Sequence, residues 1–159
     1  MNHLEKLVRQ FYAWRGYIVR GNVRVGALEH GGWAGELDIV AYHPHSGHLI
    51  HLEPSIDAHT WEERERRFRR KFAAGRRYIH SEVFPWLEPK TPLEQVAILV
   101  SATRRELGGG KVISIDEFMD TVKEAVIRRG PLCHSAIPEE YDLLRTLQLA
   151  LCGYRKVLD

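Results

Sequence analysis

The chain has little of several features that would by themselves assign a protein to a class. It contains two cysteines in 159 residues, Cys133 and Cys152, and they do not form a CxxC pair. We therefore expect reduced thiols in a cytoplasmic protein, with a disulfide between them left open. No apolar run reaches the roughly 18 residues of a membrane span, so no contact with a membrane is expected. The N-terminal residues lack the apolar core of a secretory signal.

The net charge is also small, because 23 basic residues are balanced by 21 acidic ones. A global excess of positive charge, which would indicate a nucleic-acid partner, is therefore missing, and any such signal must come from local clustering. Hydrophobic residues make up 44% of the chain. That content predicts one globular domain over residues 1–159 with a single sizeable core.

Hydrophobic periodicity predicts an α/β fold, in which helices flank a central mixed β-sheet. Apolar residues at helical spacing predict helices at about 3–14, 60–79, 114–130 and 139–151. Alternating or continuous apolar runs predict strands at 17–19, 23–25, 36–42, 49–55, 96–100 and 111–115. Thr60 with Glu63 and Ser114 with Glu117 have the spacing of capping boxes. We interpret the glycines at 108–110 as a flexible connector.

Two acidic residues lie at equal distances from one turn, and this is the most informative feature of the chain. If residues 44–47 form the turn of a hairpin, residue i faces residue 91 minus i, so Asp38 lies opposite Glu53. Opposed like charges in an antiparallel pair are destabilising. Such a pair usually needs a cation between the carboxylates, or one of them must hold its proton. The arrangement therefore indicates a divalent-metal site.

Side chains two residues apart on a strand share a face. Glu36 and Asp38 should therefore point the same way, and so should His51, Glu53 and Ser55. In the proposed register Glu36 faces Ser55 and Val40 faces His51. The opposite face is expected to be an unbroken core face made of Leu37, Ile39, Ala41, Ile50 and Leu52.

The pattern Gly35-Glu36-x-Asp38-Ile39-Val40-Ala41, followed by a strand ending in Glu53, resembles the PD-(D/E)XK nuclease superfamily. This resemblance implies a restriction-endonuclease-like core over about residues 3–118, with a C-terminal helical extension over about 119–159. It implies that Asp38 and Glu53 bind Mg²⁺ or Mn²⁺, and that Glu5 on the first helix and Glu36 assist through water. Many relatives act as dimers, so a homodimer through the last helix is possible.

One position departs from the family pattern. The family has a lysine two residues after the metal-binding glutamate, and this chain has Ser55 there. The charge of that lysine orients a water and offsets charge developing on the phosphate. Three residues could supply the cation instead: Arg67 and Lys71 on one flank of the following helix, or His51 on the strand face.

The helix at 60–79 carries a local basic cluster that the net charge conceals. It consists of Arg64, Arg66, Arg67, Arg69, Arg70, Lys71, Arg76 and Arg77. Contacts between such side chains and phosphates would give salt-dependent binding to DNA. Alternatively, the cluster is a solvated helix face, partly neutralised by neighbouring glutamates at i, i+4 spacing. Next to a carboxylate site, the first interpretation is favoured, with Arg64, Arg67, Arg70 and Lys71 as the expected phosphate contacts.

The sequence thus predicts a DNA-binding, nuclease-like protein that hydrolyses phosphodiester bonds with Mg²⁺ or Mn²⁺. A second hypothesis, supported by Ser55 at the lysine position, is a catalytically inactive binding module built on the same fold. A third is a domain whose basic helix docks an acidic protein.

Overall fold

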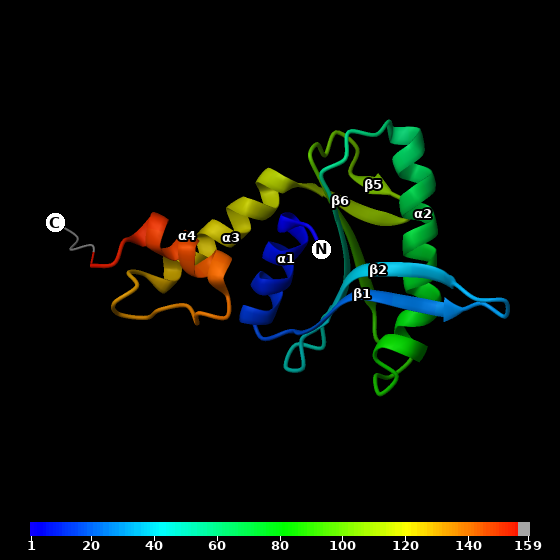
Figure 1. The fold of residues 1–159 in the computed structure, drawn as a ribbon, viewed down its shortest axis with the longest axis horizontal. Coiled ribbons are helices and arrows are strands. Elements are labelled where there is room, and N and C mark those ends of the chain that lie inside the picture. The colour runs from blue at the N-terminus through cyan, green and yellow to red at the C-terminus, as the bar shows by residue number, and fades with distance from the viewer. Residues whose placement is uncertain (156–159) are drawn as a thin grey trace.

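A central six-stranded sheet, with helices on both faces, forms the protein (Figure 1). The computed structural model describes residues 1–155, so the last four residues of the predicted domain lie outside the described part. The strand order is β1-β2-β3-β4-β6-β5. The first three strands form an antiparallel meander, β3, β4 and β6 run parallel, and β5 pairs antiparallel with β6. The predicted α/β fold with a mixed sheet is confirmed.

The helices and strands follow the predicted order closely. The strands are β1 (Ile18–Ala27), β2 (Trp33–Tyr42), β3 (Leu49–Ser55), β4 (Leu93–Leu99), β5 (Glu106–Leu107) and β6 (Gly110–Ser114). The helices are α1 (His3–Trp14), α2 (Trp61–Tyr78), α3 (Ile115–Arg129) and α4 (Asp142–Cys152), and a π-helical turn, η1 (Ile79–Val83), extends α2.

The two faces of the sheet are covered by different helices. Helix α2 lies along one face, where Phe68, Phe72 and Ala74 pack on the strands. Helices α1, α3 and α4 cover the other face, around Val8, Phe118 and other apolar residues of the largest core cluster. In Figure 1 the sheet accordingly separates α2 from the other three helices. The carboxylates of interest belong to the face that α2 covers, as shown below.

The register predicted for the hairpin is confirmed for every pair in the β2–β3 ladder. Ile39 faces Leu52, Val40 faces His51, and the remaining two pairs obey the same rule. The turn closes where the Gly47 amide donates to the carbonyl of His43 and the His43 amide to that of His48. The ladder ends at Ile39, so neither Asp38 and Glu53 nor Glu36 and Ser55 form the ladder pairs predicted for them. Asp38 and Glu53 come directly after the last pair, and Glu36 pairs with Arg24 on β1.

The prediction of two short strands before residue 26 is wrong, because β1 runs without interruption from Ile18 to Ala27. Gly21 and Asn22 disfavour a strand locally. Pairing with β2 on both sides of them overrides this preference. The ladder omits the pair Asn22 and Asp38, and Asn22 has a left-handed backbone, with φ of 51°.

The predicted core face is also wrong at one residue. Ile39 and Ala41 belong to the cluster under α1, but Leu37 joins Val40 in the cluster under α2. The alternation of side chains between the two faces of β2 is therefore broken around Asp38, where the ladder with β1 lacks the pair Asn22 and Asp38. Sequence periodicity cannot report such an irregularity, because it assumes an evenly pleated strand.

Two smaller predictions also need correction. The glycines at 108–110 form the tight turn of the β5–β6 hairpin rather than a flexible connector. A Cβ at Gly108 would overlap the backbone of α2, so a side chain there is excluded by packing as well as by its positive φ. The last helix begins at Asp142, three residues later than predicted.

The capping predictions had different outcomes. Ser114 and Glu117 form the full reciprocal box at the start of α3. At α2, the Thr60 side chain accepts from the Glu63 amide, while the Glu63 carboxylate lies near His59 instead.

Cys133 is exposed and Cys152 is buried, and both are free thiols. Within residues 1–155, no helix has the length and apolar character needed to cross a bilayer.

Candidate active site

Asp38 and Glu53 meet at the end of the β2–β3 ladder. Because that ladder stops at Ile39, the Asp38 amide has no strand partner on this side, and it donates to Glu53 Oε1 at 3.1 Å. The Glu53 side chain is only 1% exposed and that of Asp38 17%. Two carboxylates therefore sit together in a recess where water screens their repulsion poorly.

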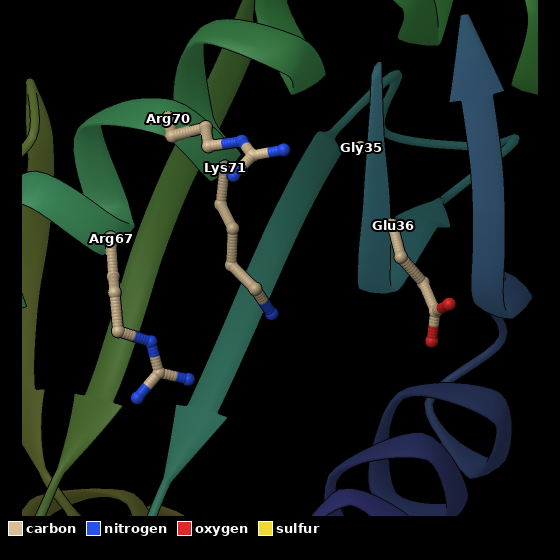
Figure 2. Close-up of a pocket in the computed structure, with 5 residues that line it drawn as sticks. All are labelled: Gly35, Glu36, Arg67, Arg70 and Lys71. Carbon is tan, nitrogen blue, oxygen red and sulfur yellow. The ribbon is translucent and has the colours of Figure 1, made fainter. Parts of the chain in front are cut away.

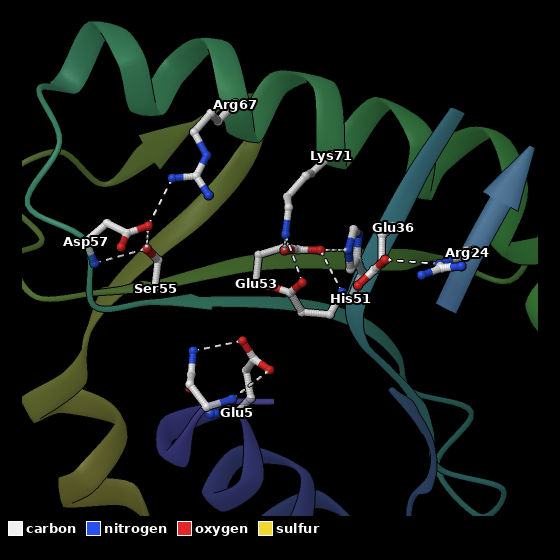
Figure 3. Close-up of polar contacts among 11 residues, drawn as sticks. Glu5, Arg24, Glu36, His51, Glu53, Ser55, Asp57, Arg67 and Lys71 are labelled. Carbon is white, nitrogen blue, oxygen red and sulfur yellow. Dashed lines mark hydrogen bonds and ion pairs between the residues drawn. The ribbon is translucent and has the colours of Figure 1, made fainter. Parts of the chain in front are cut away.

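Lys71 supplies the positive charge between them (Figure 3). Its ammonium group donates to Asp38 Oδ1 at 2.9 Å and also to Glu53 Oε2. Lys71 reaches this position because it lies three residues after Phe68 and four before Gly75, so it borders the buried face of α2 to which both belong. A lysine on α2 thus lies beside the two carboxylates. In the family pattern the lysine is on the strand instead, at the position of Ser55.

The pKa of Asp38 is raised to about 7, mainly because burial penalises the ionised form and also because Glu53 lies beside it. Burial works in the opposite direction on Lys71, but the attraction of Glu53 and Asp38 outweighs it and raises the pKa of the ammonium group. Lys71 is therefore charged at neutral pH, and Asp38 titrates close to neutrality.

His51 lies behind Glu53 and is fully buried. Its Nε2 is 2.7 Å from Glu53 Oε1. Burial, with a further contribution from Lys71, lowers the pKa of His51 to about 3. The imidazole is therefore neutral near pH 7. His51, one of the three residues expected to replace the lysine of the family pattern, thus does not supply a positive charge.

The tautomer of His51 follows from the groups behind it. Arg76 donates to Gln95 Oε1 at 2.8 Å, and Gln95 Nε2 donates to the carbonyl of Phe72 at 2.9 Å. The same Nε2 lies 3.0 Å from His51 Nδ1, which must therefore accept. His51 consequently carries its proton on Nε2 and donates it to Glu53.

Close packing holds this chain of polar groups in place. A Cβ at Gly75 of α2 would overlap both the His51 imidazole and the Gln95 amide. Glycine is thus required for α2 to approach the sheet closely here. No buried side-chain nitrogen or oxygen in the described residues lacks a hydrogen-bond partner.

Two cavities lie along α2, and one of them opens onto the carboxylates. The first has a volume of about 180 Å³ and contains Asp38 and Glu53 in its wall. Its other lining residues are Asn2, Glu5, Pro54, Ser55, Ile56, Asp57, Arg67, Phe68 and Lys71. The second, of about 210 Å³, is lined by Gly35, Glu36, Arg67, Arg70 and Lys71 (Figure 2). Arg67 and Lys71 line both, so the two cavities meet along α2.

The remaining predicted acidic and hydroxyl residues lie at the edges of these cavities. Glu5 forms a capping box with Asn2 at the start of α1, and its carboxylate makes no contact with Asp38 or Glu53. Glu36 lies 3.4 Å from Arg24 and lines the second cavity. Ser55 donates to Asp57 at 3.2 Å. The structure therefore brings Asp38 and Glu53 together and leaves these three at the rim.

The four predicted phosphate-binding residues separate into two groups. Arg64 is buried, stacks on Trp61 and donates to the backbone carbonyl of Asp57 at 2.7 Å, so it fixes the connection between β3 and α2. Arg67, Arg70 and Lys71 line the cavities instead. Of these, Arg67 also forms an ion pair with Asp57 at 3.0 Å.

The donor set suits a hard divalent cation. Mg²⁺ is commonly held by one or two carboxylates, and waters and substrate phosphates complete its shell. Asp38 and Glu53 provide two such ligands. Within the described part of the chain, no group of three or more His, Cys, Asp or Glu side chains is placed to hold one metal ion. A protein-only cage of the kind that zinc requires is thus not formed among these residues.

Comparison of the sequence with models of known protein families gives no match, and no curated protein is significantly similar to it. The resemblance to PD-(D/E)XK nucleases therefore depends on the residues and the geometry described above.

Sequence reasoning did not identify Gln95, Arg76 or Asp57 as parts of the site. Gln95 gave one usable signal, because it is a polar residue directly before the apolar run of β4. The sequence indicates Arg76 only as a member of the basic cluster of the helix at 60–79. Asp57 lies in the connection between β3 and α2. The sequence of such a connection does not indicate where its side chains point.

Proposed function

We propose that the protein is a nuclease that hydrolyses DNA phosphodiester bonds with the help of Mg²⁺ or Mn²⁺. The observation that carries this proposal is the convergence of Asp38, Glu53 and Lys71 at a cavity whose α2 wall is basic. Two carboxylates can hold a divalent cation, and a lysine beside them can stabilise negative charge that develops on a phosphate. The resemblance stated for residues 35–53 supports the same reading.

Asp38 and Glu53 would hold the cation, which when bound would activate a water and offset negative charge on the phosphate. His51 holds the Glu53 carboxylate in place through its Nε2 proton. Lys71, already within hydrogen-bond distance of both carboxylates, is positioned to donate to a phosphate oxygen. Arg67 and Arg70 extend the positive charge along α2 and would hold the flanking phosphates.

The direct test is cleavage of a labelled DNA substrate by the variant Asp38→Asn in the presence of Mn²⁺. Asn keeps the size of the side chain but removes its charge, so we expect at least about a hundredfold loss of rate. Asp120→Asn is the matched control, because Asp120 is exposed and pairs only with Lys123. If Asp38→Asn cuts as fast as the parent protein, the proposed site is wrong.

A specific observation also favours the second candidate, a nucleic-acid-binding module without turnover. Lys71 already neutralises the carboxylate pair, so a divalent cation must compete with an internal one. Titration with Mn²⁺ by calorimetry separates the two candidates. Binding that Glu53→Gln removes favours the nuclease, whereas no binding at millimolar Mn²⁺ favours the module.

A further inference from the structure

The walls of the two cavities carry opposite charges. The α2 wall presents Arg67, Arg70 and Lys71. The walls facing it present Glu5 from α1 and Glu36 from β2. Figure 2 shows Glu36 across from the three α2 cations, and Figure 3 shows Glu5 on the far side of Glu53 from α2.

Internal pairing weakens this asymmetry without removing it. Lys71 is paired with Asp38 and Glu53. Arg67 is paired with Asp57 at 3.0 Å, but the two side chains are 41% and 47% exposed, so their attraction is largely screened by water.

Glu36 and Arg24 are 3.4 Å apart, and half or more of each side chain is exposed, so their attraction is largely screened by water. Glu5 accepts hydrogen bonds from Asn2, a neutral residue, and no cation pairs with it within residues 1–155. Arg70 likewise forms no ion pair in that part of the chain. The groove between α2 and the facing walls is thus basic on one side and acidic on the other.

Such a groove matches the chemistry of one polynucleotide strand. A single strand has phosphates along one edge and bases along the other, and the bases carry amino donors that carboxylates accept. A duplex presents phosphates from both strands, and those of the second strand would lie against Glu5 and Glu36. Like charges placed together in this way cost several kcal/mol in recognition.

The depth of the site leads to the same conclusion. Glu53 is 1% exposed and lines the cavity of about 180 Å³. A flexible single strand can bend a phosphate into that recess. A stiff duplex must bend to do so, which costs free energy.

Building on the proposed function, we propose that the substrate is single-stranded DNA, with its backbone along α2 and its bases toward α1 and β2. Arg67 and Arg70 take the phosphates that flank the scissile one. Glu36 and Glu5 take base edges and reject a second strand.

The first test is fluorescence anisotropy with a labelled single-stranded oligonucleotide and with the blunt duplex of the same sequence, in EDTA so that no cleavage occurs. We expect the single strand to bind at least about tenfold more tightly. Equal or tighter binding of the duplex overturns this inference, while Mn²⁺-dependent cleavage by the same protein would leave the proposed function intact. Absence of binding to both probes also overturns this inference, whereas the proposed function is decided separately by the Mn²⁺-dependent cleavage assay.

The second test reverses the charge of one wall. Glu36→Lys adds a cation to the acidic side, so the preference for the single strand should narrow at least about threefold through tighter duplex binding. Glu124→Lys is the matched control. It makes the same change of net charge on α3, at a side chain that is 72% exposed. If both variants change the ratio of the two affinities equally, the charges of the groove do not select the substrate.

Discussion

The two faces of the sheet bury polar side chains with different partners. Under α1, α3 and α4, Gln148 is fully buried, and its amide bonds to backbone groups of Gly130, Ser135 and Ile137. Under α2, by contrast, His51, Glu53, Gln95 and Lys71 bond chiefly to one another. In the first arrangement a neutral amide forms hydrogen bonds with backbone groups of the loop between α3 and α4. In the second, charged groups are held inside the protein.

This difference shows which face is specialised. A buried amide that satisfies backbone groups stabilises the fold around it. Buried charges are costly even when paired, and apolar residues of similar volume are often as stable. The polar chain under α2 therefore has little value for stability alone, and we infer that it is retained because the carboxylates act at the cavity.

The largest expected effect comes from removing the internal cation. Lys71→Met should destabilise the protein by about 3–5 kcal/mol in chemical unfolding, because the buried Glu53 carboxylate is then left without its cation. The control Lys123→Met, which breaks an exposed ion pair with Asp120, should cost far less stability than Lys71→Met, because water screens that pair.

Adding Mn²⁺ to the same variant tests whether Lys71 competes with a divalent cation for the carboxylates. Without the competing ammonium group, Lys71→Met should gain more thermal stability from Mn²⁺ than the parent protein does, while cleavage is lost. Similar unfolding energies for Lys71→Met and Lys123→Met would mean that the polar chain under α2 is not a charged, buried system.

The next effect concerns pH. The pKa of Asp38 is raised from its ordinary range to about 7, so the folded state binds more protons than the unfolded state between about pH 4 and pH 7. Stability should therefore fall as pH rises through this window. Relative to Asp38→Asn, the parent protein should lose about 2 kcal/mol between pH 5 and pH 8. Parallel stability profiles for the two proteins would show that Asp38 titrates normally.

The smallest effect is expected at His51. His51→Leu keeps the volume but removes the donor to Glu53, so it should cost about 1–2 kcal/mol and weaken Mn²⁺ binding several-fold. His51→Gln retains an N–H donor and should recover part of that affinity. On the opposite face, Leu52→Ala should destabilise by packing loss without changing Mn²⁺ affinity in the folded protein. Equal Mn²⁺ affinity in His51→Leu and the parent would rule out a positioning role for His51.

The local sequence pattern was sufficient to predict the hairpin on which the site is built. Alternating strands and a four-residue turn predicted the hairpin register, because a side-chain period of two and a fixed turn length leave one pairing that buries the apolar residues. That register brings Asp38 to Glu53. The same reasoning failed at Leu37, where β2 departs from regular alternation at the position that the ladder with β1 omits.

Tertiary structure alone decided which cation serves the carboxylates. Lys71 is 18 residues from Glu53 and was one of three candidates in the sequence. Its selection depends on how closely α2 approaches the sheet, which the contact at Gly75 permits. Burial likewise made His51 neutral and joined it to Gln95, 44 residues away. Local pattern thus sufficed to place the two carboxylates at the same end of one hairpin. The groups that surround them depend on packing between distant segments, because distance and burial, rather than residue type, set charge state and hydrogen bonding.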